Sequence, residues 1–182
     1  MNFTLPDLFA RRIEDLLASE AAIARALPKW IARTRNEDLR AALERHLKET
    51  DAQSARLRSI AKPRAGSSDA AARCPATDAL LAEGEERLRD STPSDEADAA
   101  IVDACRRVEH HEIASYAGAI GLAAALMDTS AFEALKTTLR EEEFADETLA
   151  KVSEKNVERL REAFTRKAPD VDVSGREPIA RA

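Results

Sequence analysis

The chain has 182 residues with 34 acidic and 28 basic side chains, and its net charge of −6 repels phosphate groups, which excludes nucleic acid and anionic membrane as expected partners. The most apolar stretch, AGAIGLAAALM at 117–127, is shorter than the roughly 20 residues that a membrane-spanning helix needs. The N-terminus has no secretory leader, and Cys74 and Cys105 form no metal or disulfide motif, so a cytoplasmic protein with free thiols is expected.

Few glycines, few aromatic residues and no alternating strand pattern predict an all-α chain. The first long helix is expected over 4–33, with Thr4 as its cap and Pro28 as a local kink. The second is expected over 36–62, because a proline follows it.

The second half of the chain predicts one short and two long helices. A flexible segment, 64–76, precedes a short helix expected at about 76–90. The third long helix is expected to begin with Thr92 as its cap and Pro93 at its first helical position. The fourth is expected to begin after Ser130 and to end near residue 164.

The connections between these helices favour one fold class. Links of a few residues join the first long helix to the second and the third to the fourth, so each pair forms an antiparallel hairpin. We therefore expect an all-α, ferritin-like four-helix bundle, with two antiparallel hairpins joined by a long crossover that carries a short helix. Residues 1–165 are expected to form this domain, and 166–182 a mobile tail.

Polar residues interrupt the inward apolar stripe of every long helix near its mid-length. Positions near mid-length meet at the same height in antiparallel hairpins, so these side chains are expected to converge. The residues that interrupt or border the stripes are Glu20, His46, Glu49, Gln53, Glu109, Glu112, Glu142 and Asp146. The alternative for the glutamates is a solvated helix face.

The two hairpins look like variants of one half-site, because Glu20 and Glu49 are spaced almost as Glu112 and Glu142 are. Clustered, unpaired carboxylates cost several kcal/mol each in a low-dielectric interior, and no Lys or Arg lies on the stripes. Two divalent metal ions would balance the charge. A carboxylate-rich site favours iron or manganese, with zinc as a competitor. The alternative is a metal-free core whose carboxyls share protons.

Five segments carry a family resemblance: ASE at 18–20 with RALPK following, HLKET at 46–50 with Gln53, Cys74 ahead of ALLAEGEE, VEHHEIASY at 108–116, and TLREEEFADETL at 138–149. In this order they resemble the YciE/YciF-like ferritin-like stress proteins. The resemblance implies a ferritin-like fold, stress-linked expression in bacteria, a homodimer and a dinuclear metal centre. The Glu-x-x-His pairs of bacterioferritin and rubrerythrin are absent, since Ala52 and Ala145 occupy the histidine positions.

Ligand roles follow as hypotheses. Glu49 and Glu142 are expected to bridge two metal ions, with Glu20 and Glu112 as terminal ligands.

The remaining candidates have two interpretations each. Gln53 and Asp146, or His46 and Glu109, would have to complete the coordination. Glu109 and Asp146 are either ligands or carboxylates behind the ligands, and His46 is either a ligand or a hydrogen-bonded core imidazole. Tyr116 is either a packed aromatic residue or a donor to a ligand.

Two functions from different classes remain open. The first is a di-iron protein that reacts with oxygen or peroxide, a small oxidant, during bacterial stress. This leaves open whether it is an enzyme of the oxidase or peroxidase type. The second is a non-catalytic helical interaction protein that keeps the fold without metal.

Overall fold

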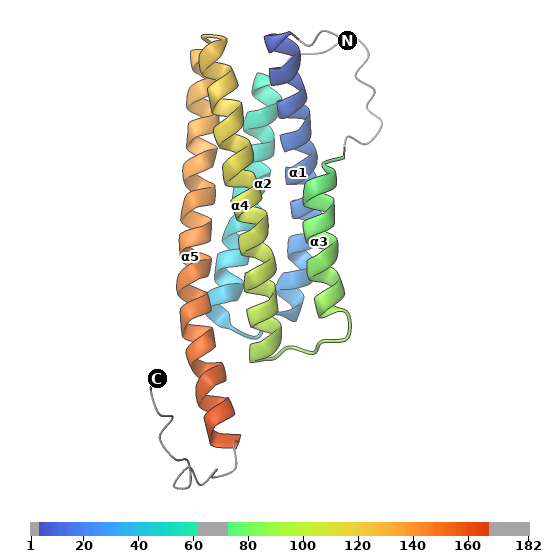
Figure 1. The fold of residues 1–182 in the computed structure, drawn as a ribbon, viewed down its shortest axis with the longest axis vertical. Helices are drawn as coiled ribbons and strands as arrows, with labels where there is room; N and C mark the ends of the chain where they lie inside the picture. The colour runs from blue at the N-terminus through green and yellow to red at the C-terminus, as the bar shows by residue number, and fades with distance from the viewer. Residues whose placement is uncertain (1–3, 62–72, 168–182) are drawn as a thin grey trace, which may run out of the picture.

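The computed structural model describes residues 4–61 and 73–167, and within these ranges every regular element is a helix (Figure 1). The expected all-α class is therefore confirmed for the described residues. The helices in chain order are α1 (Leu5–Arg33), α2 (Glu37–Ile60), α3 (Pro75–Leu88), α4 (Asp95–Ala125) and α5 (Thr129–Lys167). Along the described helices, no segment has the length and apolarity that crossing a membrane requires.

The first two helices begin at the caps that the sequence predicts. The Thr4 hydroxyl accepts a hydrogen bond from the backbone N–H of Asp7, and the Asp7 carboxylate accepts one from the backbone N–H of Thr4. The Asn36 side chain accepts hydrogen bonds from two N–H groups of α2. These caps satisfy N–H groups that have no partner inside the helix. α1 continues as a helix through Pro28.

The predicted starts of the last two long helices are wrong. Ser94 caps α4, because its hydroxyl accepts a hydrogen bond from the backbone N–H of Ala97, so Thr92 lies outside the helix. α5 begins at Thr129, ahead of the expected start, because Asp128 accepts a hydrogen bond from the backbone N–H of Ala131. Several neighbouring residues could cap each helix, and the turn geometry decided between them.

Parts of two predicted segments lie outside the described residues. These are most of the flexible segment expected at 64–76 and, from 168 onward, the tail expected at 166–182. The first two residues expected in the tail belong instead to α5.

The four long helices pack in a ring, and α3 lies outside it. α1 packs against α2 and α4, and α5 also packs against α2 and α4. α3 packs against α1 and α4, so it covers the seam between those two helices (Figure 1). The short helix expected at 76–90 is thus confirmed as α3.

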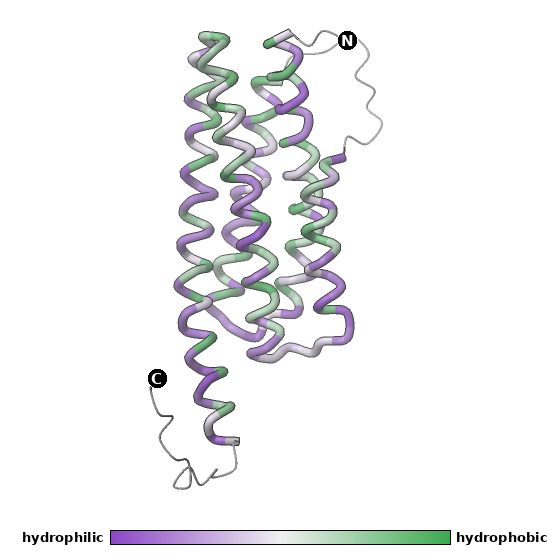
Figure 2. The backbone as a smooth tube through the Cα atoms, in the orientation of Figure 1, coloured by the Kyte–Doolittle hydropathy of each residue, from purple (hydrophilic) through white to green (hydrophobic). Residues whose placement is uncertain are grey.

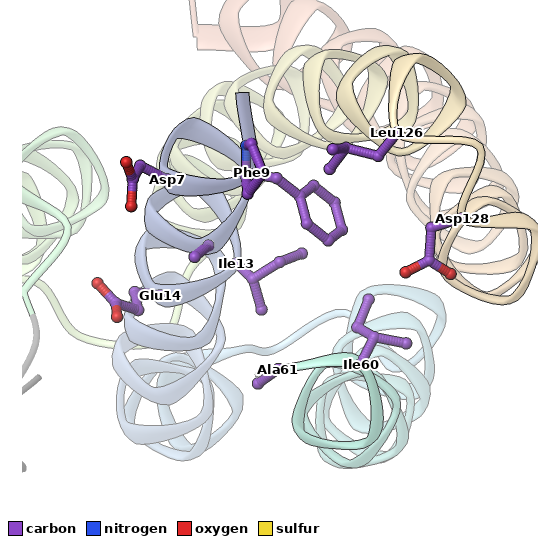
Figure 3. A pocket seen from close by; sticks show the side chains of 10 residues that line it. Asp7, Phe9, Ile13, Glu14, Ile60, Ala61, Leu126 and Asp128 are labelled. Carbon is purple, nitrogen blue, oxygen red and sulfur yellow. The ribbon is translucent and has the colours of Figure 1, made fainter. Parts of the chain in front are cut away.

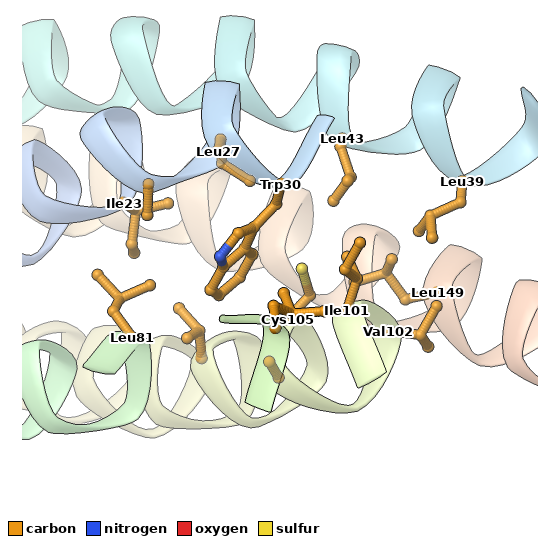
Figure 4. Packing of buried hydrophobic residues seen from close by; sticks show 14 of the residues in the cluster. Ile23, Leu27, Trp30, Leu39, Leu43, Leu81, Ile101, Val102, Cys105 and Leu149 are labelled. Atoms are coloured by element: carbon orange, nitrogen blue, oxygen red, sulfur yellow. The ribbon is translucent and has the colours of Figure 1, made fainter. Parts of the chain in front are cut away.

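Two separate apolar clusters form the core. One surrounds Trp30 and includes Leu27, Leu43, Ile101 and Leu149 (Figure 4). The other includes Phe9, Ile13, Leu57, Tyr116, Ala119 and Leu135. Hydrophilic and hydrophobic residues alternate along each helix in Figure 2, as expected for helices that bury one side.

A polar layer separates the two apolar clusters. α1 contributes Leu16 to one cluster and Ala22 to the other, with Glu20 between them. α4 likewise contributes Val108 to one apolar cluster and Tyr116 to the other, and its residues 109–112 lie between the two clusters. The polar side chains are therefore enclosed by apolar packing at both ends.

Candidate metal centre

Four side chains from three helices converge in the polar layer. One ligand atom from each of His46, Glu109, Glu112 and Glu142 lies within 4.8 Å of the others, and all four residues are buried. His46 comes from α2, the two middle glutamates from α4, and Glu142 from α5. The expected convergence of inward acidic side chains is thus present in the structure.

Glu20 brings the fourth long helix to this group. It is fully buried on α1, and the Tyr116 hydroxyl on α4 donates a hydrogen bond to its Oε1. The charges of Glu142 and Glu112 interact with Glu20, which places it beside the other carboxyls. We call Glu20, His46, Glu109, Glu112 and Glu142 the buried cluster.

The imidazole of His46 faces two of the carboxyl groups. Its Nε2 lies 3.3 Å from Oε1 of Glu109, and its Nδ1 lies 3.9 Å from Oε2 of Glu142. Burial lowers the pKa of His46 to about 4, and the charge of Arg45 adds to this effect. The ring is therefore neutral at pH 7, which is the form that offers a nitrogen lone pair to a metal ion.

Many polar atoms of the buried cluster have no hydrogen-bond partner within the described part of the chain. Both oxygens of Glu142 and both ring nitrogens of His46 are in this state. One oxygen each of Glu20, Glu109 and Glu112 is also unpartnered. Buried polar groups are normally satisfied, so this concentration of unpartnered atoms makes the polar layer the candidate site for a metal ion or for protons shared between carboxyls.

Burial raises the pKa of every carboxyl in the buried cluster. For Glu142 the pKa rises to about 7. For Glu20, Glu109 and Glu112 it lies well above the usual range, because the neighbouring carboxyls add their repulsion to burial. Without a cation, these groups therefore hold protons at a pH where exposed glutamates are ionised.

Two of the predicted ligands lie at the rim, outside the buried cluster. Glu49 is half-buried, with one oxygen 3.7 Å from the Nε of Arg45, and burial raises its pKa. Its Oε2 is buried without a hydrogen-bond partner among the described residues, and its charge acts on Glu142. Asp146 is expected on the inward stripe, but in the structure Arg106 donates a hydrogen bond of 2.8 Å to it, and His110 Nε2 lies 3.2 Å away. Asp146 is half-buried at the rim, where a guanidinium and an imidazole group stabilise its charge.

The pKa of Asp146 reflects this different environment. Partial burial acts to raise that pKa, but the hydrogen bonds and charges of Arg106 and His110 outweigh burial and lower it. Asp146 therefore differs from the buried glutamates in the sign of its pKa shift.

Gln53 is fully buried and links the rim to the polar layer. Its Nε2 donates a hydrogen bond of 3.2 Å to Glu141, and its Oε1 has no partner within the described residues. Glu141 is half-buried and accepts hydrogen bonds from Nη1 and Nη2 of Arg56, at 2.8 and 2.6 Å. α2 and α5 meet at this pair.

Sequence reasoning missed two basic residues that bind carboxylates at the rim and one hydroxyl that contacts the buried cluster. Arg56 and Arg106 were not anticipated, because a basic residue at the edge of a helix stripe resembles an ordinary surface charge. Ser19 donates a hydrogen bond of 3.2 Å to Oε1 of Glu112. The only signal for it in the sequence is its position next to Glu20 on α1.

A separate cavity lies at one end of the bundle (Figure 3). It has a volume of about 300 Å³ and is lined mainly by apolar side chains, among them Phe9, Ile13, Ile60 and Leu126. None of the buried cluster residues line it. The polar chemistry of the protein is thus distinct from this apolar cavity.

Comparisons with known proteins agree with the residue pattern. Residues 4–161 match the family model described as the domain of unknown function DUF892. The Escherichia coli K12 protein YciF is 33% identical over 159 residues, covering 87% of this chain and 96% of that protein.

Solved structures of two relatives share the fold. The crystal structure of the E. coli stress protein YciF matches with a TM-score of 0.79 and 32% identity, covering 86% of this chain and 99% of that one. YcfI from Rhodopseudomonas palustris matches with a TM-score of 0.73 and 34% identity, covering 81% of this chain and 94% of that one. The resemblance to YciF-like proteins is confirmed by these matches.

Proposed function

This chain belongs to the DUF892 family, and on that premise we propose that it is a ferritin-like protein whose buried cluster holds two divalent metal ions, most favourably iron, for reaction with oxygen or peroxide during bacterial stress. The packing of α1, α2, α4 and α5 around the cluster supports the ferritin-like part of this proposal. The name of the E. coli relative, a stress protein, supports the physiological part.

One observation carries the proposal. Both carboxylate oxygens of Glu142 and both ring nitrogens of His46 are buried without hydrogen-bond partners among the described residues. An unsatisfied buried polar group costs about 1–3 kcal/mol, and more when it is charged. Metal ions would satisfy the oxygens of Glu142 and the ring nitrogen of His46 that has a lone pair. The other ring nitrogen carries the proton and would donate it to a neighbouring carboxylate.

The donor set fits first-row divalent metals. Each metal–ligand bond to oxygen or nitrogen is about 2.0–2.2 Å, so atoms on opposite sides of one ion lie about 4 Å apart. The spacing of up to 4.8 Å among four ligand atoms is close to this value. Four carboxylates and one imidazole favour iron or manganese over soft-metal sites, with zinc as a competitor.

The charges also fit two ions. Ionised Glu20, Glu109, Glu112 and Glu142 carry four negative charges, and two divalent cations neutralise them. Metal binding would then replace the protons that these carboxyls hold in the metal-free protein.

The hydrogen bonds of the carboxyls divide them into two kinds. One oxygen of Glu20 and one of Glu112 are bound by hydroxyl groups, which leaves a single oxygen of each for a metal ion. Glu142 has both oxygens unpartnered, which suits a bridging role. When bound, iron would supply the electrons for reduction of oxygen or peroxide, whereas His46 and the carboxyls hold the ions in a water-poor layer.

Metal analysis tests this function. Protein purified without added metal, and the same protein loaded with Fe(II), should contain about two metal ions per chain. Glu142→Gln should lose most of this metal. Glu143→Gln is a matched control, because Glu143 is the next residue on α5 and is exposed, so it should bind as the unaltered chain does.

A metal-free outcome would favour the second candidate function, a helical interaction protein without a cofactor. The raised pKa values of Glu20, Glu109, Glu112 and Glu142 are the observation behind it, since neutral carboxyls can hydrogen-bond to one another. Stability that is unchanged in chelator, together with no metal in the loaded sample, would establish this alternative and contradict ours.

We also propose that the protein is a homodimer. α5 exposes two large apolar side chains on one side of its C-terminal part, Val157 and Phe164, which supports an interaction along this helix. Size-exclusion chromatography with light scattering tests it, and a monomeric mass at micromolar concentration would contradict it.

A further inference from the structure

α3 supplies no carboxylate to the buried cluster, yet one of its side chains reaches it through α1. Thr77 of α3 is fully buried, and its Oγ1 lies 2.7 Å from the Oγ of Ser19. Ser19 in turn donates a hydrogen bond to Oε1 of Glu112. A continuous path of hydroxyl groups therefore joins α3 to a residue of the cluster on α4.

Proton counting gives this path a direction. Each hydroxyl group has one proton to donate. When Glu112 is ionised it can only accept, so the proton of Ser19 goes to Glu112 and Thr77 must donate to Ser19. A charged acceptor strengthens the first of these bonds, and the second keeps the Ser19 hydroxyl oriented toward Glu112.

We propose that Ser19 and Thr77 are positioning residues, which hold Oε1 of Glu112 so that its other oxygen, Oε2, is presented to a metal ion. This inference rests on the proposed metal centre. In it, a side chain of α3 influences how tightly the buried cluster binds a metal ion. Oε2 of Glu112 has no hydrogen-bond partner among the described residues, as the proposal requires. Groups that orient metal ligands in this way typically change metal affinity by about 10–100-fold when removed.

The arrangement has a parallel at Glu20. There the Tyr116 hydroxyl binds Oε1 and leaves Oε2 unpartnered. Two glutamates on different helices are thus restrained in the same manner, one by a phenol and one by an aliphatic hydroxyl. The difference is that the restraint on Glu112 depends on a helix outside the four-helix ring.

The same path ends at a cavity on the protein surface. The Thr77 hydroxyl is also placed to donate to Sγ of Cys74, at 3.3 Å, so this sulfur competes with Ser19 for its single proton, and the hydroxyl oxygen is the stronger acceptor. Nε2 of His111 lies 3.8 Å from that sulfur. The cavity has a volume of about 340 Å³ and is also lined by Arg12 and Asp15. The outer end of the path is therefore next to groups that small reagents can contact.

Binding of Co²⁺, followed by its visible absorption, tests the proposal without any assay of activity. We expect Thr77→Val and Ser19→Ala each to weaken Co²⁺ binding by about tenfold or more. Thr77→Ser keeps the hydroxyl and should restore the affinity. Thr34→Val is the matched control, because Thr34 is a buried threonine directly after α1 whose hydroxyl donates to the carbonyl of Trp30 in that helix.

The double variant separates positioning from a packing defect. Thr77 acts only through Ser19 in our proposal, so Ser19→Ala combined with Thr77→Val should bind Co²⁺ within about twofold of Ser19→Ala alone. Losses that multiply in the double variant would overturn it. Unchanged affinity for Co²⁺ in Ser19→Ala would also overturn the proposal. This test holds even if Thr77→Val fails to fold.

The unaltered chain distinguishes this proposal from the proposed function. If that chain binds no Co²⁺, Fe(II) or Mn(II), the metal centre itself is contradicted. If it binds metal, and neither hydroxyl substitution changes the affinity or the absorption spectrum, only the positioning role is contradicted.

Discussion

The hydroxyl of Tyr116 on α4 donates a hydrogen bond to Oε1 of Glu20 on α1, across the middle of the bundle. Both residues are fully buried. This bond fixes one oxygen of a carboxyl group whose other oxygen is unpartnered among the described residues. It therefore joins the apolar cluster that contains Tyr116 to the buried cluster.

Removing this donor should weaken the metal centre. We expect Tyr116→Phe to lower Co²⁺ or Mn²⁺ affinity by about tenfold, because the Glu20 carboxylate loses its orienting hydrogen bond. Metal titration of the purified variant measures this, and its circular dichroism spectrum reports whether the helices are retained. Unchanged affinity in a folded variant would show that the bond has no role in metal binding.

The stability of the metal-free protein should depend on pH. Burial raises the pKa of Glu142 to about 7, and those of Glu20, Glu109 and Glu112 are raised well above their usual range. A carboxyl with a higher pKa in the folded state holds an extra proton there, so its stabilisation is lost as the pH rises through the folded pKa. Burial of His46 acts in the opposite direction, but that effect fades as the pH rises above its ordinary pKa of 6.5.

Between about pH 6.5 and about pH 8, we therefore expect the free energy of unfolding in chelator to fall. The slope is about 1.4 kcal/mol per pH unit for each extra proton that the folded state holds. Urea denaturation at several pH values measures it. Glu142→Gln should reduce the slope and Glu143→Gln should not. A stability that rises across this window would contradict the protonated state of the buried cluster.

Gly84 allows α3 to approach α1 and α4 closely. A Cβ atom at this position would lie 2.9 Å from the Cβ of Ala104 and 3.0 Å from Cζ2 of Trp30. We expect Gly84→Ala to destabilise the protein by about 1–3 kcal/mol, because neither the helix backbone nor the buried indole can move away without cost. Chemical denaturation measures this value.

Gly118→Ala and Gly121→Ala are the matched controls for Gly84. Both lie in α4, and an added Cβ at either meets nothing within 4 Å. Alanine favours a helix over glycine by about 1 kcal/mol, so these variants should be as stable as the unaltered protein or more so. Equal effects at all three positions would contradict the close packing at Gly84.

The two thiols should differ in reactivity. Cys74 is half-buried and lines the surface cavity next to His111, whereas Cys105 is buried in the core. Burial raises the pKa of Cys105 well above the usual range, and the charge of Glu109 adds to this. We expect one thiol per chain to react with a disulfide reagent in the folded protein, and the second only on unfolding.

Mass spectrometry of the labelled peptides identifies the thiol that reacted. Cys74→Ser should abolish the fast phase of labelling. Fast labelling of Cys105 in the folded protein would show that the core around it opens more readily than the structure indicates.

The sequence by itself determined which segments are helical and most of the residues of each helix that face inward. Both properties depend on the local period of apolar residues, which needs no knowledge of neighbouring helices. The buried positions of Glu20, Glu112 and Glu142 follow from this period. The capping box at Thr4 can also be predicted from the sequence, because a cap acts only on its own helix.

Only the tertiary structure decided which polar residues meet. Glu49 and Asp146 lie near the inward stripes, but in the packed bundle they lie at the rim beside Arg45 and Arg106, whereas His46 lies in the buried cluster. The contact between Ser19 and Thr77 depends on where α3 packs, and no local period encodes that position. Contacts between helices depend on rotation and height, and these come from the packing of the whole core.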